Sequence, residues 1–169
     1  MNKEKAKKMV REIALDLMEK AKKNLERDGH LLPIAILDTP RGMALHPMKF
    51  TNADEKHMEF LKLAAVVEVI GATQVFFITE AWVSRRKTMK EAGEVRPSLD
   101  PDRGEMIVVS YKTRESEGAV MQEFVKKGER VEFVGKVEVG EGSVAVNIMD
   151  PIFSVTVEEE GPGKSDSVH

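Results

Sequence analysis

A carboxylate stands inside an apolar run that is typical of a buried strand. Residues 74–86 read "QVFFITEAWVSRR", with Glu80 two positions before the only tryptophan of the chain. Because side chains of a strand alternate between its two faces, Phe76, Ile78, Glu80 and Trp82 share one face, and the apolar three are predicted to pack around the carboxylate. An ionised carboxylate in that setting must be paired, hydrogen-bonded or neutralised by a proton. The run therefore marks Glu80 for either a structural or a chemical role.

The structural interpretation pairs Glu80 with an arginine. A guanidinium group matches a carboxylate with two parallel hydrogen bonds. The next predicted strand follows "SLDPDRGE", so an antiparallel arrangement brings Arg103 beside Glu80, and Arg41 in a predicted turn is the other candidate. We therefore predict a Glu80–Arg103 pair that tethers the long segment between these strands, with Arg41 as the alternative partner.

The chemical interpretation is a divalent-metal site. Glu80, Asp100, Asp102 and Glu105 carry the oxygen ligands with which Mg²⁺ or Mn²⁺ is bound in phosphate and phosphodiester hydrolases. A nuclease of this kind would carry Glu-x-Lys on the strand, but Ile107 stands where the lysine is needed. This departure favours the structural interpretation. No cofactor is predicted, with Mg²⁺ or Mn²⁺ as the alternative.

Other site chemistries find little support in the sequence. The absence of cysteine excludes disulfides, thiolate catalysis and cysteine-ligated zinc. His57 lacks a second histidine four residues away, which a zinc-binding helix requires. The sequence "GPGKS" at 161–165 lacks the first glycine of a phosphate loop, because Glu158 stands there. No G-x-S-x-G motif marks a serine nucleophile.

Composition argues against nucleic acid and membranes as partners. The chain has 26 basic and 29 acidic residues and a net charge of −3. Its basic cluster around Arg85, Arg86, Lys87 and Lys90 is diluted by acidic neighbours, with Trp82 as the nearby stacking aromatic. The N-terminus lacks the apolar core of a signal peptide, and no apolar run reaches the roughly 18 residues of a membrane span. These features predict a cytoplasmic protein.

Two helices are predicted, over residues 3–28 and 53–70. In the first, apolar residues recur at three- and four-residue steps, and Gly29 supplies the left-handed residue that ends many helices. Its lysines and glutamates are interleaved on the other face, as expected for a helix packed on a sheet.

The second helix is the more apolar one. Asn52 with Glu55, or Thr51 with Asp54, has the spacing of a capping box at its start. After Leu61 the helix is apolar on more than one side. Such a helix needs cover from the sheet and from a further element, either helix 3–28 or another subunit.

The remaining pattern is β. Strands are predicted over 31–37, 42–50, 73–84, 105–113, 119–127, 130–139, 143–150 and 152–158. Short connections containing glycine favour antiparallel hairpins, one of them across the turn 38–42, and Gly135 is expected to mark a bulge. The order predicts an α+β fold, an antiparallel sheet of about six to eight strands with both helices packed on one face.

We expect one domain over residues 1–157 and a disordered tail over 158–169. Between two strands, "RRKTMKEAGEVRPSLDPDRG" at 85–104 is long for a loop in a compact domain. Such a segment is typical either of a functional loop or of a protruding charged arm.

The combination of "TEAW" at 79–82 with "DPDRGE" at 100–105 resembles small proteins of bacteria and their phages, a resemblance that implies no activity. The apolar second helix, the sheet edges and the charged arm favour a non-enzymatic domain that binds a protein partner or forms a homodimer. A metal-dependent hydrolase or nuclease around Glu80 is the alternative, and a ligand pocket beneath the second helix is a third. Whether the protein is an enzyme stays open at this point.

Overall fold

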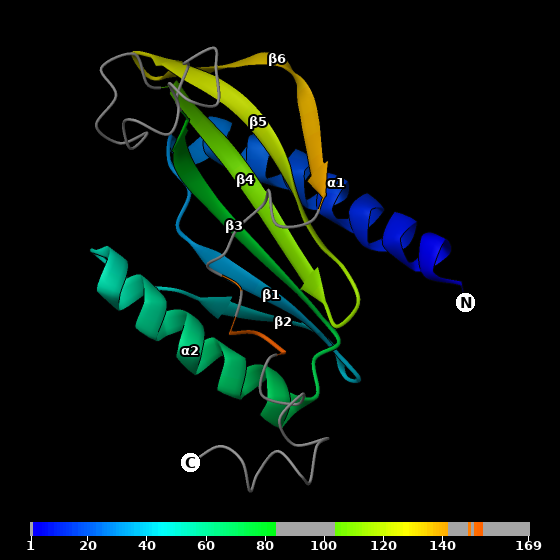
Figure 1. The fold of residues 1–169 in the computed structure, drawn as a ribbon. Coiled ribbons are helices and arrows are strands. Elements are labelled where there is room, and N and C mark those ends of the chain that lie inside the picture. Colours follow the sequence, from blue (N-terminus) through cyan, green and yellow to red (C-terminus); the bar gives the residue numbers. More distant parts are fainter. Residues whose placement is uncertain (1, 84–103, 142–148, 150, 154–169) are drawn as a thin grey trace, which may run out of the picture.

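The computed structural model describes residues 2–83, 104–141, 149 and 151–153 of the chain, which form an antiparallel sheet and two helices (Figure 1). In chain order the elements are α1 (Lys3–Asp28), β1 (Ile34–Thr39), β2 (Gly42–Pro47), α2 (Ala53–Ile70), β3 (Gln74–Val83), β4 (Gly104–Thr113), β5 (Glu117–Lys127) and β6 (Arg130–Glu141). The predicted α+β class, the bounds of both helices and a strand number within the predicted range are confirmed.

Within the described residues the sheet has six strands in the order β2-β1-β3-β4-β5-β6, and every neighbouring pair is antiparallel. The predicted hairpin at 38–42 joins β1 to β2, with Thr39 opposite Gly42. After β2 the chain passes through α2 and returns as β3 on the other side of β1, where Ile34 lies opposite Ile78. The strands β1 and β3 therefore lie inside the sheet although they come from different hairpins.

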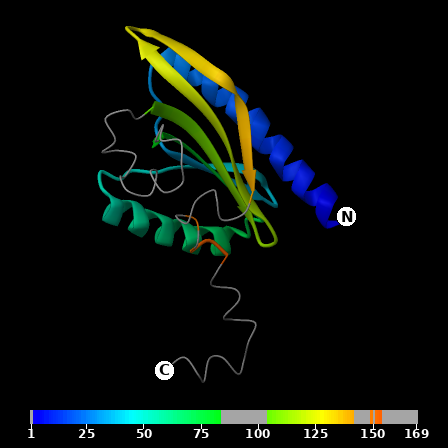
Figure 2. The ribbon, with the colours of Figure 1, turned by 45° about the horizontal axis from the view of Figure 1, so that its top comes forward.

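The two helices cover opposite faces of the sheet, so the prediction that both pack on one face is wrong (Figures 1 and 2). Phe76 and Ile78 of β3 pack into a core with α1, whereas Val75 and Phe77 pack into a second core with α2. The physical reason is the composition of β3, whose odd and even positions are both apolar, so that each face must be covered.

Local side-chain chemistry fixes where α2 begins. Asn52 accepts a hydrogen bond from the Glu55 backbone N–H at 2.8 Å. The Glu55 carboxylate in turn accepts from the Thr51 N–H at 2.7 Å and from the Thr51 hydroxyl at 2.6 Å. These bonds lower the pKa of Glu55. The predicted pairing of Asn52 with Glu55 is confirmed.

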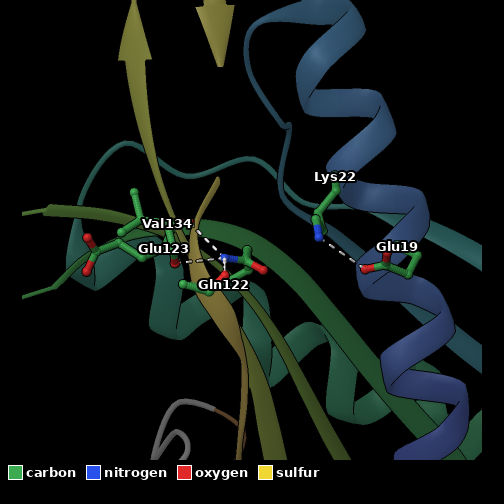
Figure 3. A network of polar contacts seen from close by, with 6 residues as sticks. Glu19, Lys22, Gln122, Glu123 and Val134 are labelled. Carbon is green, nitrogen blue, oxygen red and sulfur yellow. Dashed lines mark hydrogen bonds and ion pairs between the residues drawn. The ribbon is translucent and has the colours of Figure 1, made fainter. Parts of the chain in front are cut away.

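A bulge interrupts β6 where it was predicted. The β5–β6 register shifts between Met121 and Glu123, and Gly135 has a left-handed φ of 70°. The side-chain amide of Gln122 fills this irregularity, donating to the backbone oxygens of Glu123 at 3.0 Å and Val134 at 3.1 Å (Figure 3). Gln122 is buried, so it satisfies carbonyls that the broken ladder would otherwise leave unpaired.

The C-terminal part of the described chain differs from prediction. Met149 and Ile152 are buried in the α2 core, and the Ile152 N–H donates to the Met149 oxygen at 3.0 Å. Because 151–153 form a turn, the strand predicted over 152–158 does not begin at Ile152. The strand predicted over 143–150 lies outside the described residues except for Met149. So do the arm predicted over 85–104, except for Gly104 at the start of β4, and the tail predicted over 158–169.

Replacing Gln122 tests the bulge. Gln122→Leu keeps the side chain's bulk but removes the donor from the part-buried backbone oxygens of Glu123 and Val134, so we expect a loss of about 1 kcal/mol in unfolding free energy. Urea unfolding measures the change, and Lys136→Ala, at an exposed position of the same bulge, is the control. An unchanged stability for Gln122→Leu would show that the amide does not hold the bulge.

Candidate functional site

Helix α2 packs on the sheet with one side only. Its core side consists of Phe60, Leu63, Ala64 and Val67, which are buried against the β1–β3 face of the sheet. The ring of Phe60 meets that of Phe77 edge to face, with 4.8 Å between centroids. The core side of α2 therefore packs directly on this face of the sheet, where a ligand pocket was one of the possibilities.

The opposite side of α2 is apolar and exposed. Met58, Leu61, Ala65 and Val69 follow each other at three- and four-residue steps, so they form one stripe along about three turns. Met58 is 53% exposed, Leu61 42% and Val69 85%. We call these four residues the outer stripe. An exposed apolar row on a helix that already buries another row is typical of an interaction surface.

A groove of about 490 Å³ lies beside the outer stripe at the N-terminal end of α2. It is formed by residues of the 49–51 segment and of the first turns of the helix: Lys49, Phe50, Thr51, Asp54, Glu55, Met58, Glu59 and Lys62. Its apolar parts are Phe50 and Met58, and Met58 belongs to the outer stripe as well. We call it the Phe50 groove. Stripe and groove thus form one continuous surface.

Charge is distributed unevenly along this surface. The Phe50 groove carries both signs of charge, with Lys49 and Lys62 beside Asp54, Glu55 and Glu59. The ammonium of Lys56 lies 5.4 Å from the Phe50 ring centroid. Burial lowers the pKa of Lys56. The last turn of α2 has no basic residue to offset the negative end of the helix dipole. The two ends of the stripe are therefore electrostatically different.

Glu80 lies in the last half of β3, and its carboxylate has a partner on each of two sides. Its carboxylate accepts a hydrogen bond from the Leu31 N–H at 2.8 Å and lies 3.6 Å from the Lys126 ammonium. Its side chain is 24% exposed. Leu31 belongs to the link between α1 and β1, and Lys126 belongs to β5, on the far side of β4. Glu80 therefore connects β3 to that link and to the second strand along the sheet.

Neither predicted arginine partner of Glu80 is seen beside it among the described residues. Arg41 lies in the turn after β1, next to the end of β1 that is paired with Gln74. Glu80 lies beyond the opposite end of β1, so Arg41 does not pair with Glu80. Arg103 lies outside the described residues. Of the three predicted packing residues, Phe76 and Ile78 are buried, but Trp82 is 43% exposed. Trp82 is thus a surface residue near the end of β3.

The proposed metal ligands are only partly described. Glu105 lies opposite Trp82, and Glu80 lies opposite Ile107, so alternation places both carboxylates on the same face of the sheet. Asp100 and Asp102 lie outside the described residues. Within the described part of the chain, no three histidine or acidic side chains are grouped as a metal would require.

Sequence reasoning missed Lys126 as the partner of Glu80. Ile107 lies opposite Glu80 on one strand and Gln122 on the next, and Lys126 lies four residues along β5 from Gln122. The signal that could have found this pair is the alternation of side chains along β5. It places Gln122, Phe124 and Lys126 on the same face of the sheet as Glu80. Using it requires the register of three strands, which a single sequence does not supply.

Comparison with known proteins identifies a family. The family described as bacteriophage lambda protein ea47 matches residues 1–159, so the chain belongs to this family. No curated protein and no solved structure matches the chain. No helix among the described residues is both long enough and apolar enough to span a membrane. The family's description states no activity, so function must be argued from the surface.

Glu80→Gln tests the structural role of the carboxylate. The amide keeps an acceptor for the Leu31 N–H but loses the charge facing Lys126, so we expect a loss of about 1 kcal/mol in unfolding free energy. Lys126→Met removes only the partly exposed ion pair and should cost less. Chemical denaturation of both single variants and the double variant measures the coupling.

A titration of the same proteins with Mn²⁺ separates this role from the metal-site alternative. Saturable Mn²⁺ binding that Glu80→Gln abolishes, with no loss of stability in the variant, would contradict the structural role.

Proposed function

We propose that this protein is a non-enzymatic domain that acts by self-association and protein binding through the outer stripe of α2. The observation that carries the proposal is the pair of apolar rows on one helix. One row is buried in the core, and the other, which includes Leu61 and Val69, is exposed. A homodimer is the simplest assembly that covers such a row, because a two-fold axis uses the same patch twice.

The energetic argument is the hydrophobic effect. Fully burying a side chain of the size of Met58, Leu61 or Val69 is worth about 1.5–3 kcal/mol. Two copies contribute these side chains together, against the entropy lost on association. A contact limited to one helix and the Phe50 groove is small for a stable interface. We therefore expect a dimer that dissociates in the micromolar range.

The proposal requires no cofactor. It places the protein in the cytoplasm without a membrane or nucleic acid as partner, in keeping with the net charge of −3. The alternative, a metal-dependent hydrolase, depends on Asp100 and Asp102 joining Glu80 and Glu105. Among the described residues Glu80 already has two partners, Leu31 and Lys126, which favours the binding domain.

Leu61→Glu tests the proposal. A carboxylate in the middle of the outer stripe would have to be desolvated in the dimer but stays hydrated in the monomer, so we expect at least a tenfold weaker association. Sedimentation velocity over a concentration series measures it, with 18.9 kDa as the monomer mass. Circular dichroism and the melting temperature verify that the variant folds.

The matched control is Leu45→Glu. Leu45 is an exposed leucine of β2 that lies opposite Ile36, on the α1 face and therefore away from α2. The substitution Leu45→Glu should leave the strength of association unchanged. A wild-type chain that stays monomeric at high micromolar concentration would contradict self-association. A dimer that Leu45→Glu dissociates and Leu61→Glu does not would place the contact on β2 instead.

A further inference from the structure

We infer that two copies pair their α2 helices antiparallel, so that Val69 of each copy enters the Phe50 groove of the other. This inference rests on the proposed self-association and specifies its occupant, a second copy of this chain, and its geometry. The structure shows a protruding apolar side chain at one end of the outer stripe and a groove with apolar parts at the other end.

Spacing along the helix supports this register. Met58 and Val69 are eleven positions apart, which is about 16 Å at 1.5 Å per residue. Their midpoint lies between Leu61 and Ala65, the two inner residues of the stripe. When two copies cross antiparallel at that midpoint, each Val69 faces the Met58 end of the other helix. In a parallel pair, Val69 would face Val69 and groove would face groove.

Shape is self-complementary in the antiparallel arrangement. Val69 is 85% exposed, more than any other large apolar residue among those described. The Phe50 groove, at about 490 Å³, has room for a valine side chain and offers Phe50 and Met58 as apolar contacts. A two-fold axis makes this contact twice, once at each end of the interface.

Charge disfavours the parallel pair. The carbonyl end of α2 has no basic residue in its last turn. The antiparallel partner would bring the N-terminal, positive end of its own α2 dipole next to that negative end. The groove lining itself carries both signs there, Lys49 and Lys62 beside Asp54, Glu55 and Glu59. Lys62 lies 4.0 Å from Glu59 on an exposed surface, a weak interaction that leaves it able to reorient. A parallel pair would instead bring the acidic first turns, Asp54 and Glu55, together.

The absence of cysteine makes a cross-linking test direct, because a single introduced cysteine is the only thiol. The three variants are Met58→Cys, Ala65→Cys and Val69→Cys, each oxidised mildly in the full-length protein and resolved on a non-reducing gel. A disulfide forms only when the two Cα atoms approach within about 7 Å. Leu45→Cys, exposed on β2, reports random collisions.

The antiparallel pair predicts a specific pattern. Ala65→Cys should cross-link with itself, because the two copies of this position are offset by only about 4.5 Å along the axis. Met58→Cys and Val69→Cys alone should cross-link no more than Leu45→Cys. An equimolar mixture of Met58→Cys and Val69→Cys should give roughly tenfold more cross-linked dimer than either alone.

Other results would overturn the inference, each in a distinguishable way. Self-cross-linking of Met58→Cys and of Val69→Cys, without enrichment in the mixture, would indicate a parallel pair. A protein that sediments as a dimer but gives only the Leu45→Cys level at all three positions would place the contact away from the outer stripe. Sedimentation as a monomer at every concentration would contradict the proposed self-association itself.

Discussion

The constraint on which the structure depends is that β3 is apolar on both faces. Val75 and Phe77 point to one side, and Phe76 and Ile78 to the other, and all four are buried. A strand of this kind is stable only in the interior of a sheet with cover on each face. The chain meets this requirement by placing β3 between β1 and β4 and by assigning one helix to each face.

The exposed apolar side of α2 follows from the position of the two helices on opposite faces of the sheet. Helix α1 needs only one apolar side, because its polar side faces solvent. Helix α2 has one side in the core, yet its sequence continues apolar through Leu61, Ala65 and Val69 on the other. Had both helices shared one face, α1 could have covered this row. With α1 on the far side of the sheet, α1 does not cover this row, which is the surface that we propose for a second copy of the chain.

Much of the fold could be predicted because the signals are local. The Asn52–Glu55 cap, the glycine at 71 and apolar periodicity define α2, and Gly135 defines the bulge. The side of the sheet that each helix covers is a non-local property, as is the partner of Glu80, since Lys126 becomes its neighbour only through the register of β3, β4 and β5. Trp82 was expected in the core but is partly exposed near the end of β3.

The most direct test of the central claim, that the outer stripe is the contact surface, is a methyl NMR dilution series on the unmodified protein. The methionine methyl of Met58 reports on α2, and that of Met43, exposed on β2, reports on the other side of the sheet. We predict that the Met58 signal shifts with concentration, together with those of Leu61 and Val69, while Met43 stays constant. Concentration-dependent shifts at Met43 with an invariant Met58 would contradict the account.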